Sequence, residues 1–497
     1  MLVKTSPDEI QNFLSDASNF TGSCDAVYFP ESSAEIAEIL KAADKEKTQV
    51  TIAGNGTGLT GARVPRGGIV ISTERLNKVL EINGEERYAV VEPGVILADF
   101  QELVRKKNLL YPPDPTEKNC FIGGTVATNA SGEKTFKYGP TRDYVIELEV
   151  LTSKGETLNL WRGAQTAENY SLSLKTNEGS EYKITLPDYE MPHTKNASGY
   201  FCKKDMDAID LFIGSEGTLG VITKIKLKLV PLPEDIISCI IFFEDEKDAL
   251  AFITEARNIS LNTKVRDDKR CIEALALEYF DDNSLRFMSE DYPQVPSEAK
   301  SAVWFEQEVT SKNEDTFFEC WMDLIKEFHG DEETAWFAVT EADKQKIIAF
   351  RHSVSVKVNE QIAKYGLRKL GTDVAVPDDK FEELYFNSKK IVEDAGMEYI
   401  IYGHAGNSHI HLNMLPKSKE QYETGLKLYD KICSEAVRLG GTVSAEHGIG
   451  KAKTRHLIEM YGLENVKKMA EVKKVLDPNF VLGRGNIFEE DILTQRR

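Results

Sequence analysis

Three of the chain's eight histidines lie within the stretch GHAGNSHIHLN at residues 403–413. Imidazole is a common metal ligand, and its unperturbed pKa near neutrality also suits it to accept protons. If HIHLNM forms a strand, His409 and His411 share one face, because successive side chains of a strand alternate. Spacing alone therefore predicts that His409 and His411 act as a pair. His404 is separated from them by a turn-like insert. The alternative from this stretch is a half-buried strand with one polar, solvated face.

The glycine-rich stretch TIAGNGTGLTG at residues 51–61 offers a second kind of chemistry. It contains G-x-G-x-x-G at Gly56, Gly58 and Gly61, which binds dinucleotides when a helix follows at once. The continuation ARVPRGGIVIS holds a proline and two glycines that forbid a helix, so a nicotinamide-type Rossmann site is excluded. Successive backbone N–H groups of such a loop can still cradle a pyrophosphate. The alternative is a glycine-rich turn without a ligand.

These motifs must be positioned by a chain of 497 residues, which is too long for one compact core. Short β-branched runs alternate with Gly- and Pro-rich turns from residue 67 to 150, whereas residues 240–400 mix long charged helices with isolated strands. We therefore expect two α+β domains and a final segment that returns to the first. The expected division is 1–233, 234–455 and 456–497, with a polar, poorly periodic inserted loop at 163–194.

The composition disfavours several classes of protein. Hydrophobic residues make up 41% and charged residues 29%, so disorder is not expected, and a net charge of -20 argues against binding nucleic acid. The longest apolar run, IISCIIFF at 236–243, is far shorter than the ~20 residues of a transmembrane helix. The start lacks a signal-peptide apolar core, so we expect a cytoplasmic protein. Seven scattered cysteines without C-x-x-C are typical of reduced thiols.

Three further stretches are dense in Gly, Pro, Asn and Thr: VEPGV at 91–95, a long segment at 111–145, and GSEGTLGVITKIKL at 214–227. Small residues let backbone walls approach a flat ring and a diphosphate closely. With these motifs in this order, the chain resembles the FAD-linked oxidase family, whose flavin domain is of the vanillyl-alcohol-oxidase or PCMH type. The similarity is greatest to its D-2-hydroxy-acid dehydrogenase branch, which includes D-lactate, glycolate and D-2-hydroxyglutarate dehydrogenases. It extends from about Ala26 to Phe488.

The resemblance implies a fold and a cofactor. The expected fold is α+β: a two-part PCMH-type FAD-binding domain, an α+β substrate (cap) domain with an antiparallel sheet, and a C-terminal tail that returns to the FAD domain. Non-covalent FAD is implied, because no His or Cys matches the tethering positions of covalent members. The residues that the resemblance assigns to FAD are Asn55, Gly56, Thr57, Gly58, Leu59, Thr60, Gly61, Pro113, Gly124, Thr125, Thr128, Asn129, Gly132, Tyr138, Gly139, Glu216, Gly217, Gly220, Ile222 and Asn486.

The same resemblance bears on the histidines. The family pattern G-H-x-G-D-G-N-x-H-x-N covers the first stretch, and E-H-G-I-G matches AEHGIG at 445–450. Carried over by position, His404, His411 and Glu446 become ligands of a divalent metal, with Zn, Mn and Fe as candidates, and His447 becomes the catalytic base. This chain reads N-S-H where the family has D-G-N, so spacing and resemblance disagree about His409.

Arg351, Lys369 and the Glu446–His447 pair can each be interpreted further. Arg351, in AFRHSVSV, resembles the family's arginine for the substrate carboxylate, whereas the alternative is a solvated charge on a helix. Lys369, in KLGTDVAVP, is displaced by two positions from a lysine of some relatives. The Glu446–His447 pair could instead cap a helix that begins near Ile449.

The implied reaction is oxidation of a small anionic D-2-hydroxy acid, D-lactate being the first candidate. The metal would chelate the substrate hydroxyl and carboxylate, His447 would take the hydroxyl proton, and hydride would pass from C2 to flavin N5. A quinone, a cytochrome or an electron-transfer flavoprotein is the expected acceptor, with peripheral membrane association and a homodimer left open. The alternatives are an FAD-dependent oxidase of another alcohol or lactone, a metal-dependent hydrolase, and a flavin-binding subunit without activity.

Overall fold

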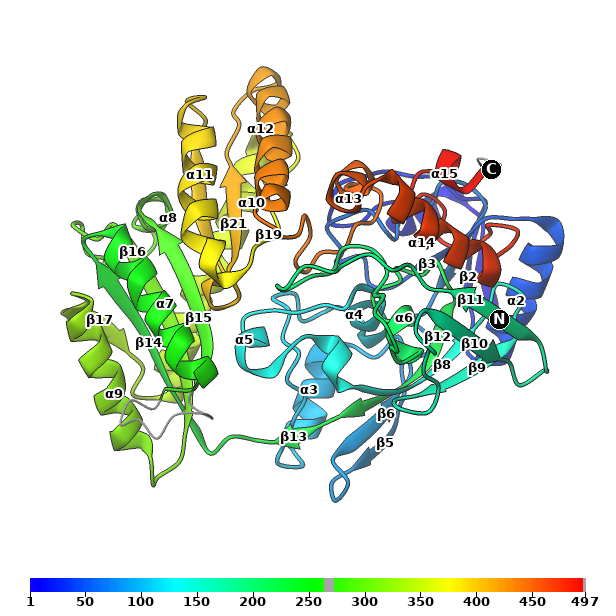
Figure 1. Ribbon diagram of the computed structural model, residues 1–497, viewed down its shortest axis with the longest axis horizontal. Coiled ribbons are helices and arrows are strands. Elements are labelled where there is room, and N and C mark those ends of the chain that lie inside the picture. The colour runs from blue at the N-terminus through cyan, green and yellow to red at the C-terminus, as the bar shows by residue number, and fades with distance from the viewer. Residues whose placement is uncertain (263–271, 495–497) are drawn as a thin grey trace.

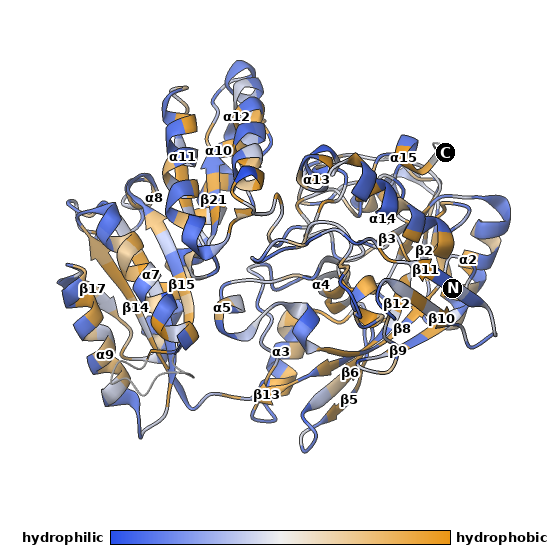
Figure 2. Ribbon diagram, in the orientation of Figure 1, coloured by the Kyte–Doolittle hydropathy of each residue, from blue (hydrophilic) through white to orange (hydrophobic). Residues whose placement is uncertain are grey.

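The computed structural model describes residues 1–262 and 272–494 and shows two lobes side by side, joined near β13 (Figure 1). The first lobe holds the N-terminal half of the chain and the last helices, and the second holds most of residues 235–440. Strands are mostly hydrophobic, whereas helices alternate hydrophobic and hydrophilic faces (Figure 2). Among the helices that the structure describes, none combines the length and apolar character needed to cross a membrane.

The first sheet of the first lobe has the order β1-β2-β4-β3, in which β2, β4 and β3 run parallel. Its elements are β1 (Leu2–Lys4), β2 (Ala26–Phe29), β3 (Val50–Ala53) and β4 (Ile69–Ser72), preceded by α1 (Pro7–Ile10) and η1 (Gln11–Phe13). Helix α2 (Ser33–Glu46) joins β2 to β3, and its N-terminus is capped by the Ser32 side chain, which accepts from the Glu35 N–H. No helix lies between β3 and β4, as the sequence predicted.

The second sheet of this lobe is antiparallel, with the order β5-β6-β12-β8-β9. Alternate residues of β12 (Val221–Lys228) are buried, because only one face meets the core. The other strands are β5 (Val79–Asn83), β6 (Tyr88–Val91), β8 (Val145–Leu151) and β9 (Thr157–Trp161), and β7 (Leu109–Leu110) pairs with β13 (Val230–Pro231). The intervening helices are α3 (Leu97–Arg105), α4 (Ile122–Thr128), α5 (Thr135–Tyr138), η2 (Thr141–Tyr144) and α6 (Ile209–Phe212).

The segment 163–194 is not a plain loop. It contains the antiparallel hairpin of β10 (Ser171–Lys175) and β11 (Glu181–Thr185). Both strands bury alternate residues only, so one face of the hairpin packs inward and the other is solvated. The prediction of an unstructured insert is therefore wrong for this part of the segment.

The second lobe is built on an eight-stranded antiparallel sheet of order β17-β14-β16-β15-β20-β21-β18, with β19 also paired to β21. Its strands are β14 (Asp235–Phe243), β15 (Ala274–Asp281), β16 (Ser301–Val309), β17 (Asp331–Phe337), β18 (Leu370–Gly371), β19 (Val374–Ala375), β20 (Tyr399–Gly403) and β21 (His409–Met414). Its helices are α7 (Glu246–Asn262), α8 (Asp282–Met288), α9 (Glu314–Glu327), α10 (Glu341–Lys364), η3 (Asp378–Lys380), α11 (Phe381–Glu393), η4 (Ala405–Asn407) and α12 (Lys419–Arg438).

Helices cover both faces of this sheet. Successive residues of β14 alternate between two hydrophobic clusters: Ile241 and Phe243 belong to one, Ile240 and Phe242 to the other. All six residues of β21 are consequently buried, although three of them are polar. The strand predicted for HIHLNM is confirmed, but the alternative of a solvated polar face is wrong.

The C-terminal segment returns to the first lobe through α13 (Thr454–Tyr461), α14 (Leu463–Leu476) and α15 (Glu490–Thr494). The Val50 N–H donates to the Val481 carbonyl at 2.7 Å and the Gly483 N–H to the Val50 carbonyl at 2.9 Å, so the tail extends the first sheet beside β3. The predicted return of the tail is confirmed. Cys24, Cys120, Cys202, Cys239 and Cys433 are free thiols, and Cys271 lies outside the described residues.

Candidate active site

A cleft in the first lobe is lined mainly by backbone and small side chains. Its walls come from the loop between β3 and β4, from residues around α4, and from the turn before β12. A Cβ atom added at Gly54, Gly58 or Gly124 would meet no other residue within 4 Å, so the glycines leave open space on the cleft side. We call this feature the glycine cleft. Its narrow, backbone-lined form fits a flat ring and a diphosphate.

Most residues that the resemblance assigns to FAD lie in this cleft. Those that line it are Asn55, Gly56, Thr57, Gly58, Leu59, Thr60, Gly124, Thr125, Thr128, Glu216, Gly217, Gly220 and Ile222. Asn129 and Gly139 line a neighbouring cavity instead, and Gly61, Pro113, Gly132, Tyr138 and Asn486 are absent from the lining of both. Asn486 acts behind the wall, where its amide donates to the carbonyls of Ala62 and Glu216.

Glu446 and His447 line the same cleft, at the place where the second lobe meets the first. His404 directly follows β20, and His411 lies on β21, the strand paired with β20. The three polypeptide segments thus bring four side chains together, and we call His404, His411, Glu446 and His447 the imidazole cluster.

The predicted metal ligands converge on one oxygen. Glu446 Oε1 lies 3.4 Å from His404 Nε2 and 3.3 Å from His411 Nε2. One ligand atom from each of these residues and from His409 falls within 4.8 Å of the others. Two imidazoles and a carboxylate are a donor set that divalent transition metals accept, with coordination positions left for a substrate.

In both His404 and His411, the Nδ1 atom, which points away from Glu446, already has a partner. His404 Nδ1 lies 2.6 Å from Glu278 Oε1, and His411 Nδ1 lies 3.1 Å from the Thr372 carbonyl, to which it donates. Such outer partners fix ring orientation and direct the Nε2 lone pair at a metal. Burial acts to lower the pKa of His404, but the Glu278 and Glu446 carboxylates together outweigh it and the pKa is raised. Burial lowers the pKa of His411.

Lys195 neutralises the second oxygen of the carboxylate, because its Nζ donates to Glu446 Oε2 at 2.6 Å. Burial alone would raise the pKa of Glu446, yet Lys195 and His404 hold that pKa well below its usual range. Glu446 is therefore a carboxylate, as a ligand must be.

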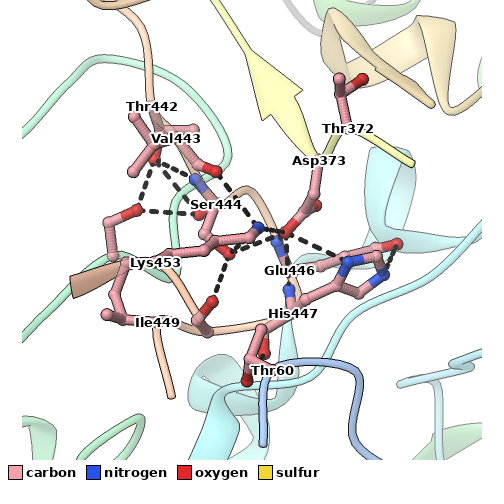
Figure 3. Close-up of polar contacts among 12 residues, drawn as sticks. Thr60, Thr372, Asp373, Thr442, Val443, Ser444, Glu446, His447, Ile449 and Lys453 are labelled. Carbon is pink, nitrogen blue, oxygen red and sulfur yellow. Dashed lines mark hydrogen bonds and ion pairs between the residues drawn. The ribbon is translucent and has the colours of Figure 1, made fainter. Parts of the chain in front are cut away.

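Asp373 organises the base (Figure 3). Its Oδ2 lies 3.3 Å from His447 Nδ1 and accepts from Lys453 Nζ at 2.9 Å, and its carboxylate also accepts the N–H groups of Glu446 and His447. Thr372 and Asp373 interrupt the pairing of β18 and β19 with β21, and this irregularity turns the carboxylate toward the cluster. Burial lowers the pKa of His447 to about 4, so the ring is a neutral base near pH 7.

The loop after His447 is held by a carboxylate of the glycine cleft. Glu216 accepts from the N–H groups of Ile449 and Gly450 at 2.8 and 2.7 Å, and burial raises its pKa to about 7. The next helix begins only at Thr454. The interpretation of Glu446–His447 as a cap on a helix near Ile449 is therefore wrong, because Glu216 holds those amides in a loop.

His409 is fully buried beside the imidazole cluster, on the same face of β21 as His411. Its Nε2 lies 3.0 Å from Asp373 Oδ1, and its Nδ1 lies 3.4 Å from Lys195 Nζ. Burial lowers its pKa well below the usual value, so the ring is neutral. It thus lies between the carboxylate that orients the base and the lysine that neutralises Glu446.

Arg351 is 2% exposed, so the alternative of a solvated helix charge is wrong. Its Nε donates to Glu278 Oε2 at 2.7 Å, and its guanidinium stacks on the Tyr402 ring at 5.0 Å. Burial acts to raise the pKa of Tyr402, but Lys369 and Arg351 outweigh it and the pKa is lowered. Arg351 and Lys369 therefore both act on Tyr402, and Arg351 also engages Glu278.

The sequence motifs did not single out Glu278, Asp373 or Lys195 as functional. Asp373 stands in GTDVAVP, but only the folded chain brings Asp373 to His447 and Lys195 to Glu446. Glu278 carries no signal in its own strand, ALALEYFD, except that it is a charge within a buried run.

Comparisons with known proteins cover nearly the whole chain. The sequence model for "FAD binding domain" matches residues 24–160, and that for "FAD linked oxidases, C-terminal domain" matches residues 234–487. A D-lactate dehydrogenase of Anaerostipes hadrus is 30% identical over 92% of this chain and 88% of its own. Glycolate oxidase subunit GlcD of Bacillus subtilis is 30% identical, covering 94% and 89%. A D-2-hydroxyglutarate dehydrogenase of Xanthomonas citri pv. viticola is 27% identical, covering 98% and 94%.

Solved structures share the fold at lower identity. The 4-ethylphenol oxidase of Gulosibacter chungangensis superimposes with a TM-score of 0.69 at 19% identity, covering 99% of this chain and 95% of its own. An alkyldihydroxyacetonephosphate synthase gives a TM-score of 0.67 at 17% identity, covering 97% and 82%.

Proposed function

The chain belongs to the FAD-linked oxidases, and from this premise we propose that it oxidises a D-2-hydroxy acid to the 2-oxo acid, with D-lactate the first substrate to test. The family and the PCMH-type FAD-binding fold predicted from the sequence are confirmed. The chain is an FAD-dependent oxidoreductase that acts on a CH–OH group. The observation that carries the substrate proposal is the imidazole cluster at the end of the glycine cleft.

His404 Nε2, His411 Nε2 and Glu446 Oε1 would hold a divalent metal, for which Zn, Mn and Fe remain the candidates. When bound, the metal would polarise the substrate hydroxyl and lower its pKa. Glu278 and the Thr372 carbonyl keep both rings oriented for ligation. Lys195 keeps Glu446 ionised before any metal arrives.

His447 would accept the hydroxyl proton at Nε2. Asp373 engages Nδ1, so the lone pair of Nε2 faces the cluster, 3.7 Å from Glu446 Oε1. The same carboxylate would stabilise the imidazolium once the proton is taken, since the two groups lie 3.3 Å apart. A base that is neutral near pH 7 meets the requirement of the step.

Arg351, Lys369 and Tyr402 form the group that would bind the substrate carboxylate. Glu278 engages Arg351 through Nε, which leaves the terminal guanidinium nitrogens as donors. Glu278 therefore couples this group to His404, because its two oxygens engage both residues.

FAD, bound without a covalent link in the glycine cleft, would accept the hydride. The residues that line the cleft would contact it through backbone and small side chains, and Asn486 would support the wall from behind. The electrons would then pass to a quinone, a cytochrome or an electron-transfer flavoprotein. A cytoplasmic location, peripheral membrane association, a homodimer and the three-part domain division also stay predictions.

Anaerobic bleaching of the flavin tests the proposal. Purified protein mixed with D-lactate, D-2-hydroxyglutarate or glycolate should lose its absorbance near the flavin maximum, and L-lactate should leave it unchanged. A chelator should stop bleaching without releasing FAD, and Zn, Mn or Fe should restore it. Bleaching that persists after complete metal removal would exclude the metal from the reaction, and absence of bleaching by every D-2-hydroxy acid tested would exclude the substrate class.

A further inference from the structure

A second cavity, which we call the side cavity, lies next to the imidazole cluster and has a volume of about 570 Å³. One wall is formed by residues 189–204, which follow the β10–β11 hairpin, and another by residues 129–143. Asn407 and Ala445, which flank the cluster in sequence, complete it. Nothing in the proposed reaction occupies this space.

The side cavity and the glycine cleft share a thin partition. Ser131 lines both, and its hydroxyl donates to Glu446 Oε2 at 3.4 Å. Lys195 lines the side cavity with a side chain that is only 5% exposed. Its ammonium has three N–H donors, of which Glu446 engages one and His409 Nδ1 faces another. The third donor remains for a group inside the cavity.

The charges of the lining favour an anion, in a chain whose net charge is -20. Lys203 and Lys204 are exposed at this cavity and form no ion pair with the described residues. The lining also holds two exposed acids: Glu190, which lies 3.7 Å from His193, and Asp143, which interacts with the charges of Arg142 and Arg162. Isolated lysines beside a largely enclosed lysine attract and hold a carboxylate.

The apolar part of the cavity lining favours a ligand with a flat ring. Tyr170, Tyr189 and Phe201 line it, and Met191 and Pro192 add apolar atoms. Aromatic walls bind flat rings through offset and edge contacts. A ring-bearing carboxylate satisfies both the cationic and the aromatic parts of the lining.

We propose that the side cavity is a second binding site, which takes an aromatic carboxylate and couples its binding to that of the catalytic metal through Lys195. The coupling rests on the metal site proposed above. A carboxylate in the side cavity draws the ammonium from Glu446 Oε2, so that Glu446 offers more of its charge to a cation. Anion and metal therefore strengthen each other's binding, by the same factor in both directions.

Calorimetry on the FAD-loaded protein, with benzoate as the probe, measures this coupling. Benzoate should bind, whereas benzamide, which lacks the charge, and acetate, which lacks the ring, should bind at least about tenfold more weakly. Saturating benzoate should tighten Zn²⁺ binding about fivefold or more, and Zn²⁺ should tighten benzoate binding by the same factor. Benzoate that leaves Zn²⁺ affinity unchanged, or equal binding of benzamide, would overturn the proposal.

Two variants locate the site. Lys203→Glu combined with Lys204→Glu should abolish benzoate binding and keep flavin and Zn²⁺ binding, since both lysines are exposed. Lys106→Glu combined with Lys107→Glu changes the same charge at exposed positions outside the cavity and should bind benzoate normally. Undiminished benzoate binding in the first variant would place the probe in the substrate site and refute the assignment.

Lys195→Met separates the coupling from the binding. Benzoate should bind more weakly but measurably, held by Lys203 and Lys204, and its effect on Zn²⁺ affinity should disappear. Retained coupling in this variant would contradict the role of Lys195. Failure of flavin bleaching would refute the proposed oxidation alone, because these binding measurements do not require turnover.

Discussion

The glycine cleft and the imidazole cluster adjoin each other but are built from different kinds of residue. The cleft is shaped by glycines whose missing side chains leave room, as at Gly54, Gly58 and Gly124. The cluster is shaped by charged side chains that hold one another, such as Lys195 on Glu446 and Lys453 on Asp373. The shape of the glycine cleft should tolerate substitutions elsewhere in the protein. The buried charges of the imidazole cluster stabilise one another, so the loss of any one partner should disturb the others.

The difference predicts separable functions. Changes to the metal ligands of the cluster should remove metal and flavin reduction and leave FAD bound, and changes to the cleft should weaken FAD binding and leave the metal bound.

The largest effect is expected from Glu446→Gln. The variant loses the charge of the proposed metal ligand, so flavin bleaching by D-lactate should fall below detection while the flavin spectrum stays normal. Glu423→Gln, at an exposed position of helix α12, is the matched control and should bleach at the native rate. Stopped-flow absorbance measures both, and native bleaching in Glu446→Gln would remove this residue from the mechanism.

His447→Asn should lower the bleaching rate by about 100- to 10,000-fold, the usual contribution of a general base. Its metal content, measured by atomic absorption, should stay equal to that of the unmodified protein, since His447 is not a proposed ligand. A rate within threefold of native would assign the base to another group.

The pH dependence of stability should also distinguish the two regions. In the unfolded chain His447 takes a proton near pH 6.5, but in the folded protein only near pH 4. Between these values the unfolded state binds more protons at this residue, so the contribution of His447 to stability falls as pH decreases through this window. The loss amounts to about 3 kcal/mol for metal-free protein. Urea unfolding should show a shallower pH slope for His447→Gln than for the unmodified chain, and equal slopes would contradict the assignment.

Glu278→Gln should weaken Zn²⁺ binding by about 10- to 100-fold, because the carboxylate orients His404 rather than binding the metal. Competition with a chelating dye measures this affinity. An unchanged affinity would show that the contact between Glu278 and His404 plays no part in ligation.

Gly124→Val should lower FAD affinity by about tenfold, since its side chain enters the space of the cofactor. Zn²⁺ affinity should stay unchanged. Gly84→Val makes the same substitution at an exposed position where a Cβ meets no other residue, and fluorescence titration should give it native FAD affinity. Parallel loss of Zn²⁺ binding in Gly124→Val would show that the two regions are not separable.

The contrast also explains what the sequence could predict. The residues that line the glycine cleft lie in short contiguous stretches of the sequence. Its loops and the absence of a helix after Gly61 could therefore be predicted from local rules. His404, His411, Glu446 and His447 could be named because two short motifs carry them.

The supporting residues could not be predicted, because they come from distant segments. Asp373 reaches His447 across 74 positions and Lys195 reaches Glu446 across 251. The burial of His409 also escaped local rules, since a strand with alternating polar residues predicts one solvated face. Here helices cover both faces of the sheet, and that is a property of the whole lobe.

The pairing of the tail with β3 has a consequence for biosynthesis. Residues 481–486 supply the neighbour of Val50 and the amide that ties Ala62 to Glu216, so the wall of the glycine cleft is completed by a segment more than 400 positions after Val50. When only the N-terminal half of the first lobe has emerged from the ribosome, the cleft of the nascent chain is incomplete. We expect FAD to load only after residues 481–486 have been synthesised, and cells short of FAD to accumulate apoprotein that contains this segment.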